Sequence, residues 1–328
     1  MVVHLLLGLL TILIGAELFT NAVEWLGKRL RLSEGVVGNL LAAVGTALPE
    51  SIVPMVAFLS GGTDAVHIGV GAILGAPFML GTLAMFITGF AAWAFPWRGE
   101  GRQFLQVNER AVRRDMQFFL LMFVTALAAA FLPSRKMQYG IAAFLVLGYG
   151  FYAYQTVKHG QSLSEENLKP LYLGMRSAPG LGLILLQLCA GLSAIVGGAN
   201  FFVAGIGQMA VLLGIQPLIL ALLIAPIATE LPEKFNSVIW ISQRKDGLAL
   251  GNITGAMVFQ STMIPAFGML AVQWRLDYPS LLSSGFTLLS VASLYAGICA
   301  RGRVGTTQLM LCGLCYVGFL AMIVWCVL

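Results

Sequence analysis

Long apolar runs, separated by short polar turns, follow one another along the whole chain. We expect spanning helices over residues 4–24, 36–59, 65–95, 117–132, 139–157, 180–207, 216–242, 247–274, 280–300 and 306–327. A helix needs about 20 apolar residues to cross the hydrocarbon of a bilayer, and nearly every run reaches that length. Only 10 % of the 328 residues are charged, whereas a soluble domain carries about a quarter. The sequence therefore predicts an all-α, polytopic membrane protein with ten transmembrane helices.

Basic residues are distributed unevenly between the two sides that these spans define. Fifteen lysines and arginines fall in loops on one side, and three fall on the other. Because loops rich in lysine and arginine stay in the cytoplasm, we expect both termini outside the cell membrane. The polar stretch 158–179 is then a cytoplasmic linker. The net charge of +5 is a topology signal, and we expect no nucleic-acid partner.

The sequence contains two copies of one pattern, aligned without a gap at an offset of 183 residues. The segment GAELFTNAVEWLGKRLRLSEGVVGNLLAAVGTALPE (15–50) matches GANFFVAGIGQMAVLLGIQPLILALLIAPIATELPE (198–233), including a shared T-x-L-P-E. Each copy has five spans, an odd number, so the second copy enters the bilayer from the opposite side. We therefore expect a 5+5 inverted repeat with residues 1–157 and 180–328 as its halves, as in many secondary transporters.

Each T-x-L-P-E places a proline inside an apolar helix. Pro49 has no N–H to bond the carbonyl of Gly45, and Pro232 has none for the carbonyl of Ala228. In hydrocarbon an unpaired carbonyl costs several kcal/mol unless another group satisfies it. A bound cation can do so, which makes both carbonyls candidate ligands.

A threonine and a glutamate accompany each freed carbonyl within one helical turn. Thr46 and Glu50 belong to the first copy, and Thr229 and Glu233 belong to the second. Their hard oxygen atoms are the ligands that Ca²⁺ collects in flexible geometry, so we expect both copies to form one site near the bilayer midplane. The alternative is that each proline only kinks its helix and each glutamate pairs with a neighbour. Two carboxylates brought together also repel, so protons should compete with the metal.

Further polar residues accompany this pattern. Asn252 and Gln260 offer side-chain oxygens from the third helix of the second copy. Glu230 is a third acidic candidate ligand, and Lys234 follows it at i+4 on the same helix face. Lys234 is either a structural partner of Glu230 or an internal counter-charge in the place of a coupling cation. On the first helix, Glu17 lies deep enough to be a candidate for a proton pathway.

Two pairs of blocks resemble a known family. GNLLAAVGTALPES with VGAILGAPFML, and ALLIAPIATELPEKFNS with LALGNITGAMVFQ, are similar to the α-repeats of the cation/Ca²⁺ exchanger superfamily, which includes sodium/calcium and proton/calcium exchangers. The α-repeats would cover residues 36–95 and 216–274. The resemblance implies ten spans, outside termini and a central Ca²⁺ site at Thr46, Glu50, Thr229 and Glu233.

The chain departs from the family pattern at positions that hold Na⁺ in sodium-coupled relatives. Serines of that pattern are replaced by Ala47, Glu230, Ala76 and Ala256, and its last polar positions by Leu80 and Gln260. The resemblance therefore implies a cation antiporter of this fold rather than a three-sodium exchanger.

We expect a secondary active antiporter that exchanges a divalent cation, with Ca²⁺ as the first candidate, for H⁺ or Na⁺ by alternating access. Its partners would be inorganic cations and the lipid bilayer, with no resident cofactor. Two alternatives stay open: a carrier of a different ion or solute in which Lys234 replaces a coupling cation, and a non-transporting membrane sensor or scaffold. An enzyme is not expected, because the sequence shows no Ser/His or Asp/Asp constellation.

Overall fold

The computed structural model describes residues 2–29, 42–95, 103–159, 169–174 and 179–327. Within these ranges, nothing is described of the side chains of residues 42–49, 157, 159, 228, 231–236, 326 and 327. The elements are α1 (Val2–Arg29), α3 (Ala42–Ser60), α4 (Thr63–Met79), a π-helical segment η2 (Leu80–Ala84), α5 (Met85–Ala94), β1 (Phe104–Leu105), α6 (Glu109–Ala128), a 3-10 turn η4 (Ala129–Phe131), α7 (Arg135–His159), α8 (Leu181–Leu213), α9 (Pro217–Ser242), α10 (Asp246–Ala271), α11 (Tyr278–Arg301), β2 (Val304–Gly305) and α12 (Thr306–Val327).

Seven helices of the described chain are long and apolar enough to cross a membrane: Val2–Arg29, Thr63–Ala94, Glu109–Phe131, Leu181–Leu213, Asp246–Ala271, Tyr278–Arg301 and Thr306–Trp325. The other three predicted spans fall on α3, α7 and α9. Because some side chains of α3 and α9 are not described, the described apolar part of each helix is shorter, namely Glu50–Ser60 and Pro217–Ile227. Large apolar side chains such as Leu147 and Val211 point outward, as helices that face lipid require. The protein is thus a helical membrane protein, and the count of ten spans stays a prediction.

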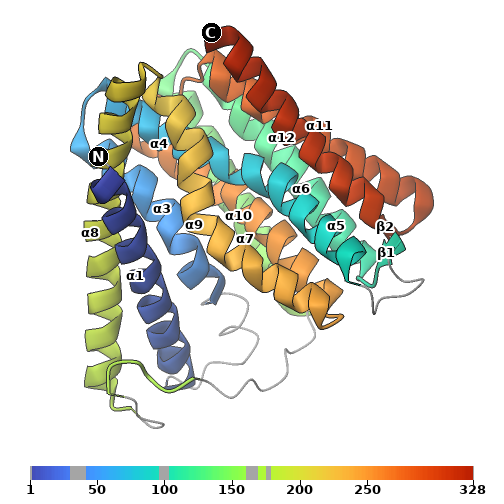
Figure 1. Cartoon of the computed structure of the whole chain (residues 1–328), viewed down its shortest axis with the longest axis horizontal. Helices are drawn as coiled ribbons and strands as arrows, with labels where there is room; N and C mark the ends of the chain where they lie inside the picture. Colours follow the sequence, from blue (N-terminus) through green and yellow to red (C-terminus); the bar gives the residue numbers. More distant parts are fainter. Residues whose placement is uncertain (1, 30–41, 96–102, 160–168, 175–178, 328) are drawn as a thin grey trace.

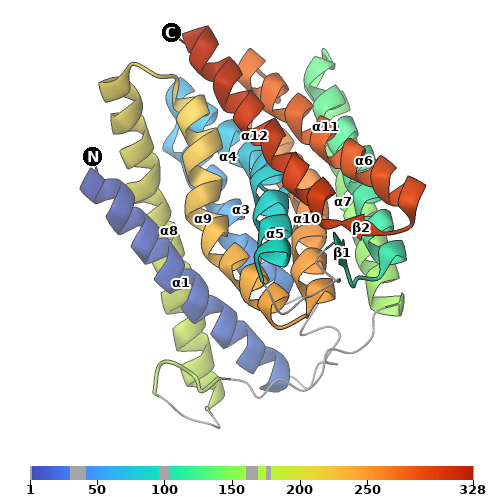
Figure 2. The same cartoon turned by 45° about the vertical axis from the view of Figure 1, so that its right-hand side comes forward.

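The helices form a central layer with a flank on either side. Figure 1 shows α1 and α8 side by side at one edge, and α11 and α12 at the opposite edge. Between them lie α3, α4, α9 and α10, with α4 packed along α9. The turned view in Figure 2 again separates the α1–α8 pair from α11 and α12 by this layer. The α1–α8 pair meets the rest of the molecule mainly along α3.

Glycines bring the backbones of α1 and α8 into direct contact. A Cβ atom added to Gly15 would lie 2.8 Å from the carbonyl oxygen of Gly191, and one added to Gly191 would lie 2.9 Å from that of Gly15. Gly8 and Gly198 repeat this relation, with both distances at 2.8 Å. At the offset of 183, Gly8 corresponds to Gly191 and Gly15 to Gly198. Equivalent helices thus make one contact twice while running antiparallel, which is the relation expected inside an inverted repeat.

The helix α6 begins eight residues before its predicted span 117–132. Asn108 caps the helix, because its Oδ1 accepts a hydrogen bond of 3.2 Å from the backbone N–H of Ala111. The first two turns are rich in charge and therefore do not belong to the apolar run. Their Asp115 is nevertheless buried, and its carboxylate accepts a 2.8 Å hydrogen bond from Thr254 of α10.

A π-helical segment interrupts the long helix over the predicted span 65–95. The segment η2 joins α4 to α5 shortly after Pro77, which has no N–H for the α-helical ladder. Ser290 of α11 donates a 2.6 Å hydrogen bond to the carbonyl oxygen of Gly81 within this segment. The hydroxyl of Ser290 therefore provides a hydrogen bond to a carbonyl group of the π-helical turn. The apolar run over 65–95 gives no sign of this interruption.

Candidate cation-binding site

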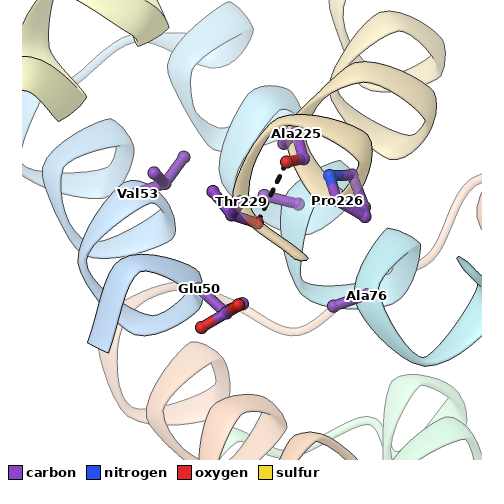
Figure 3. Close-up of a pocket in the computed structure, with 7 residues that line it drawn as sticks. Glu50, Val53, Ala76, Ala225, Pro226 and Thr229 are labelled. Atoms are coloured by element: carbon purple, nitrogen blue, oxygen red, sulfur yellow. Dashed lines mark hydrogen bonds between the residues drawn. The ribbon is translucent and has the colours of Figure 1, made fainter. Parts of the chain in front are cut away.

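Glu50 of α3 is buried, with 7 % of its surface exposed. Its carboxylate borders a small pocket between three helices, shown in Figure 3. The lining residues are Glu50 and Val53 of α3, Ala72 and Ala76 of α4, and Ala225, Pro226 and Thr229 of α9. Because α3 and α4 belong to the first copy of the repeat and α9 to the second, the pocket lies where the two copies meet.

Thr229 reaches this pocket from α9, opposite Glu50 of α3 (Figure 3). Its hydroxyl donates a 3.0 Å hydrogen bond to the carbonyl oxygen of Ala225, one turn earlier. Because the hydroxyl proton is used in this bond, the threonine oxygen keeps lone pairs that a cation can use. Glu50 and Thr229, one from each copy, therefore offer hard oxygen atoms to the same space.

Four of the predicted ligands fall outside the described side chains, namely Gly45, Thr46, Ala228 and Glu233. The backbone at these positions belongs to α3 and α9, so each lies within about one or two helical turns of Glu50 or Thr229. Their role as ligands stays a prediction. Within the described part of the chain, no three His, Cys, Asp or Glu side chains come together as a metal-binding group.

Methyl groups and a proline ring form most of the remaining pocket wall. Ala76 stands at a serine position of the exchanger pattern, and it lines the pocket from α4 together with Ala72. Pro226 and Ala225 line it from α9. Because a methyl group cannot ligate a cation, this wall has fewer oxygen atoms than the family pattern would provide.

A known protein family matches most of this chain. A sequence model of the family "Sodium/calcium exchanger protein" matches residues 1–158 and 183–327. The chain belongs to this sodium/calcium exchanger family. The gap between the two matched blocks, residues 159–182, overlaps the predicted linker 158–179, and the division into two halves stays a prediction. The resemblance that the α-repeat motifs carried is therefore confirmed.

Individual relatives of this exchanger-family chain cover nearly its full length. The inner membrane protein YrbG of Escherichia coli (strain K12) is 24 % identical over 329 residues, which is 98 % of this chain and 96 % of that protein. The solved H⁺/Ca²⁺ exchanger CAX has a TM-score of 0.75 at 19 % identity and covers 97 % of this chain and 81 % of its own. The sodium-calcium exchanger NCX_Mj has a TM-score of 0.60 at 22 % identity, with coverages of 98 % and 97 %. At such identities these likenesses establish the fold.

Glu230 and Gln260 of this exchanger-family chain bind each other. The Nε2 atom of Gln260 donates a 2.6 Å hydrogen bond to Oε1 of Glu230, and the residues are 3 % and 1 % exposed. Neither residue lines the pocket. Glu230 follows Thr229 directly on α9, and one step along a helix turns a side chain by about 100°. The role of Glu230 and Gln260 as direct ligands stays a prediction. The side chain of Lys234, the predicted counter-charge of Glu230, lies outside the described residues.

Two other polar candidates also lie apart from the pocket lining. Asn252 is half-buried on α10 and is not among the lining residues. The side chain of Glu17 on α1 is 61 % exposed, and its carboxylate binds Lys169 and Tyr172 of the linker. Glu17 thus contacts the linker at an exposed position, and its role in a proton pathway stays a prediction.

One glycine pattern occurs in both copies of the repeat, and the structure describes a close helix contact for the first copy. On α4, a Cβ atom added to Gly71 would lie 2.5 Å from the carbonyl oxygen of Leu218, and one added to Gly75 would overlap the α9 backbone. On α10, the corresponding Gly251 is exposed and has no described atom within 4 Å of its Cβ position. Gly255 has one, a tyrosine hydroxyl at 3.9 Å. The close contact in the first copy involves Leu218 and Leu222 of α9, whose counterparts at the offset of 183, residues 35 and 39, lie outside the described chain.

Proposed function

We propose that this chain is a secondary active antiporter that exchanges a divalent cation, with Ca²⁺ as the expected substrate, for H⁺ or Na⁺. The observation that carries the proposal is the pocket that Glu50 of one copy and Thr229 of the other line together. A carboxylate inside spanning helices is costly, and such residues mark ion pathways. The two solved relatives described above are an H⁺/Ca²⁺ exchanger and a sodium-calcium exchanger, which supports this class of substrate.

Both halves would supply ligands to the cation. We assign the carboxylates to Glu50 and Glu233, the hydroxyl oxygens to Thr46 and Thr229, and the backbone oxygens to Gly45 and Ala228. Ca²⁺ binds roughly 6–8 oxygen atoms, so water molecules would complete the shell. Glu230, held by Gln260, would contribute negative charge from behind this shell, and Asn252 would add a polar group from α10.

The lining of the pocket favours H⁺ over Na⁺ as the counter-ion. A Na⁺ ion must replace its hydration shell by several oxygen ligands, and Ala72 and Ala76 offer methyl groups instead. A proton needs only a carboxylate, and two carboxylates that share one site release their protons when a divalent cation arrives. Coupling to H⁺ therefore requires no ligand beyond those assigned to the metal.

Alternating access would occur in a 5+5 inverted repeat with both termini outside the cell membrane. In that orientation Gly71 lies in the outer half of α4, and Gly251 lies in the cytoplasmic half of α10. The close packing of α4 on α9 at Gly71 and Gly75 supports a state that is closed on the outer side. An exchange of packing between the halves would then produce the opposite state.

Purified protein in lipid vesicles tests the proposal. Uptake of Ca²⁺ should be measured while a pH gradient and a Na⁺ gradient are imposed separately, and we expect the pH gradient to drive it. Glu50→Gln should reduce uptake by at least the roughly 10-fold loss seen when metal sites are disturbed. Asp64→Asn, which alters an exposed carboxylate at the start of α4, should keep the wild-type rate. An absence of divalent-cation transport under either gradient would overturn the proposal and favour a sensor or scaffold.

A further inference from the structure

Residues 169–174, which we call the linker strap, lie against the α1–α8 pair. The backbone carbonyl of Lys169 accepts hydrogen bonds from Nε1 of Trp25 at 3.0 Å and from Nδ2 of Asn21 at 3.4 Å. The N–H of Tyr172 donates back to Oδ1 of Asn21 at 3.3 Å. The strap is therefore bound to α1 through its own backbone.

The same strap is bound to α8 through Gln187, which is fully buried. Its Oε1 accepts a 2.8 Å hydrogen bond from the N–H of Leu173. Its Nε2 donates to Oδ1 of Asn21 and to the carbonyl oxygen of Leu18, both at 2.9 Å. One amide side chain thus joins α8, α1 and the strap, and every polar atom of that amide has a partner.

Apolar and charged contacts reinforce the strap on either side of this network. Leu171 is fully buried in a cluster with Ala22 and Trp25 of α1 and Ile184 of α8. At the rim, the Tyr172 hydroxyl donates a 2.5 Å hydrogen bond to Glu17, and Nζ of Lys169 lies 3.4 Å from the same carboxylate. These rim groups are largely exposed, so the backbone bonds and the buried leucine carry most of the attachment.

The polar anchors occur at one end of a pair that is otherwise symmetric. At the offset of 183, Gln187 corresponds to His4 and Trp25 to Gln208. At the opposite end of the pair, Nδ1 of His4 lies 3.2 Å from Oε1 of Gln208, and no described linker segment crosses there. The position equivalent to Asn21 is Ala204, which offers no side-chain hydrogen bond. The two ends have therefore diverged where the strap binds.

We propose that the linker strap is a staple that fixes the cytoplasmic ends of α1 and α8 to each other, so that the pair moves as one unit during transport. The glycine contacts between the two helices are mainly backbone against backbone, so they allow close approach without a polar bond of their own that fixes the register. The strap bonds both helices at once and therefore opposes sliding of one helix along the other. This inference rests on the proposed function only for the motion it serves, and the staple itself can be tested without transport.

Distances between spin labels test the staple directly. In a variant without the native cysteines, one pair of labels is placed at the cytoplasmic ends, at exposed Lys28 and Gly182, and a second pair at the outer ends, at exposed Val3 and Val211. Double electron–electron resonance should give a narrow distance distribution at both ends of the wild-type pair. Leu171→Ala should broaden the distribution at the cytoplasmic end and leave the outer end unchanged.

Two further variants separate a staple from a general loss of packing. Gln187→Leu removes the amide that joins both helices and should reproduce the broadening of Leu171→Ala. Leu173→Ala shortens a more exposed leucine of the same strap and should leave both distributions as in the wild type. Should Gln187→Leu fail to insert, Leu171→Ala carries the test, because it changes neither helix. An unchanged cytoplasmic end in Leu171→Ala, or equal broadening at both ends, overturns the proposal.

Transport then distinguishes this inference from the proposed function. No strap residue lines the pocket, so Leu171→Ala should lower the maximal rate of Ca²⁺ uptake several-fold without changing the half-saturating concentration. A change in the half-saturating concentration with an unchanged maximal rate would count against the staple. If the wild-type chain transports no cation, the proposed function fails, whereas the label distances still decide whether the strap is a staple.

Discussion

Ala76 shows at the scale of one residue how this pocket departs from the pattern of its family. It is buried, it lines the pocket with Glu50 and Thr229, and it stands where the exchanger pattern has a serine. A single hydroxyl therefore separates the present wall from one with an additional oxygen ligand. Since the side chains of alanine and serine differ little in volume, the chemistry of this position can be changed with little change in packing.

We expect Ala76→Ser to bring Na⁺ into competition with Ca²⁺ and to lower the half-saturating Ca²⁺ concentration. A net gain of about 0.5–1.5 kcal/mol for one new polar contact corresponds to roughly a 2- to 10-fold change. Uptake of Ca²⁺ into vesicles at increasing Na⁺ on the same side measures both effects. Ala65→Ser, at a buried alanine of the same helix α4 outside the pocket lining, is the matched control and should behave as the wild type. Equal effects of both variants would contradict a role for Ala76 in the pocket.

The T-x-L-P-E pattern predicted that Glu50 and Thr229 lie close together, but it did not predict their hydrogen-bond partners, and their role as ligands stays a prediction. Glu50 and Thr229 do border one pocket, because the repeat places equivalent hairpins against each other. The hydrogen bond between Gln260 and Glu230 was not predicted, since it depends on the rotation of α10 relative to α9. Sequence spacing indicates neighbours on one helix, which is why Lys234 was assigned to Glu230, but it does not indicate contacts between helices.

At the scale of elements, α1 and α8 make the same glycine contact twice, so equivalent substitutions should have equivalent effects. Gly15→Ala and Gly198→Ala each place a methyl group 2.8 Å from the backbone of the partner helix. We expect each to destabilise the protein by about 1–3 kcal/mol, as overpacking does. Gly207→Ala, with open space at its Cβ position, should be neutral or slightly stabilising. Thermal unfolding in detergent, followed by tryptophan fluorescence, compares the three, and a large loss for only one of the first two would contradict the symmetric contact.

The sequence predicted the type of each element better than its limits. Hydropathy indicated helices throughout, but it did not indicate the polar start of α6. There Asn108 caps the helix, and the buried Asp115 accepts a hydrogen bond from Thr254. It also did not reveal the segment η2, because the hydroxyl that satisfies Gly81 comes from Ser290, more than 200 residues away. Both features depend on tertiary partners, which an apolar run does not identify.

At the scale of the whole molecule, the repeat is symmetric in sequence, and the structure describes one of its two equivalent helix contacts. The face of α4 at Gly71 is filled by α9 at Leu218. The counterpart of Gly71 on α10 is Gly251, and no described atom lies within 4 Å of its Cβ position. If transport exchanges the packing of the two halves, Gly251 must meet backbone in one of the two states, as Gly71 does now.

We therefore expect Gly251→Val to abolish Ca²⁺ exchange. In the state in which this face of α10 closes, its methyl groups would meet backbone, as a Cβ atom at Gly71 meets the carbonyl of Leu218 at 2.5 Å now. Gly285→Val on α11, which also has open space at its Cβ position, is the control and should transport normally. Exchange at the wild-type rate in Gly251→Val would mean that this face stays open throughout the cycle, and the two halves would then not exchange their packings.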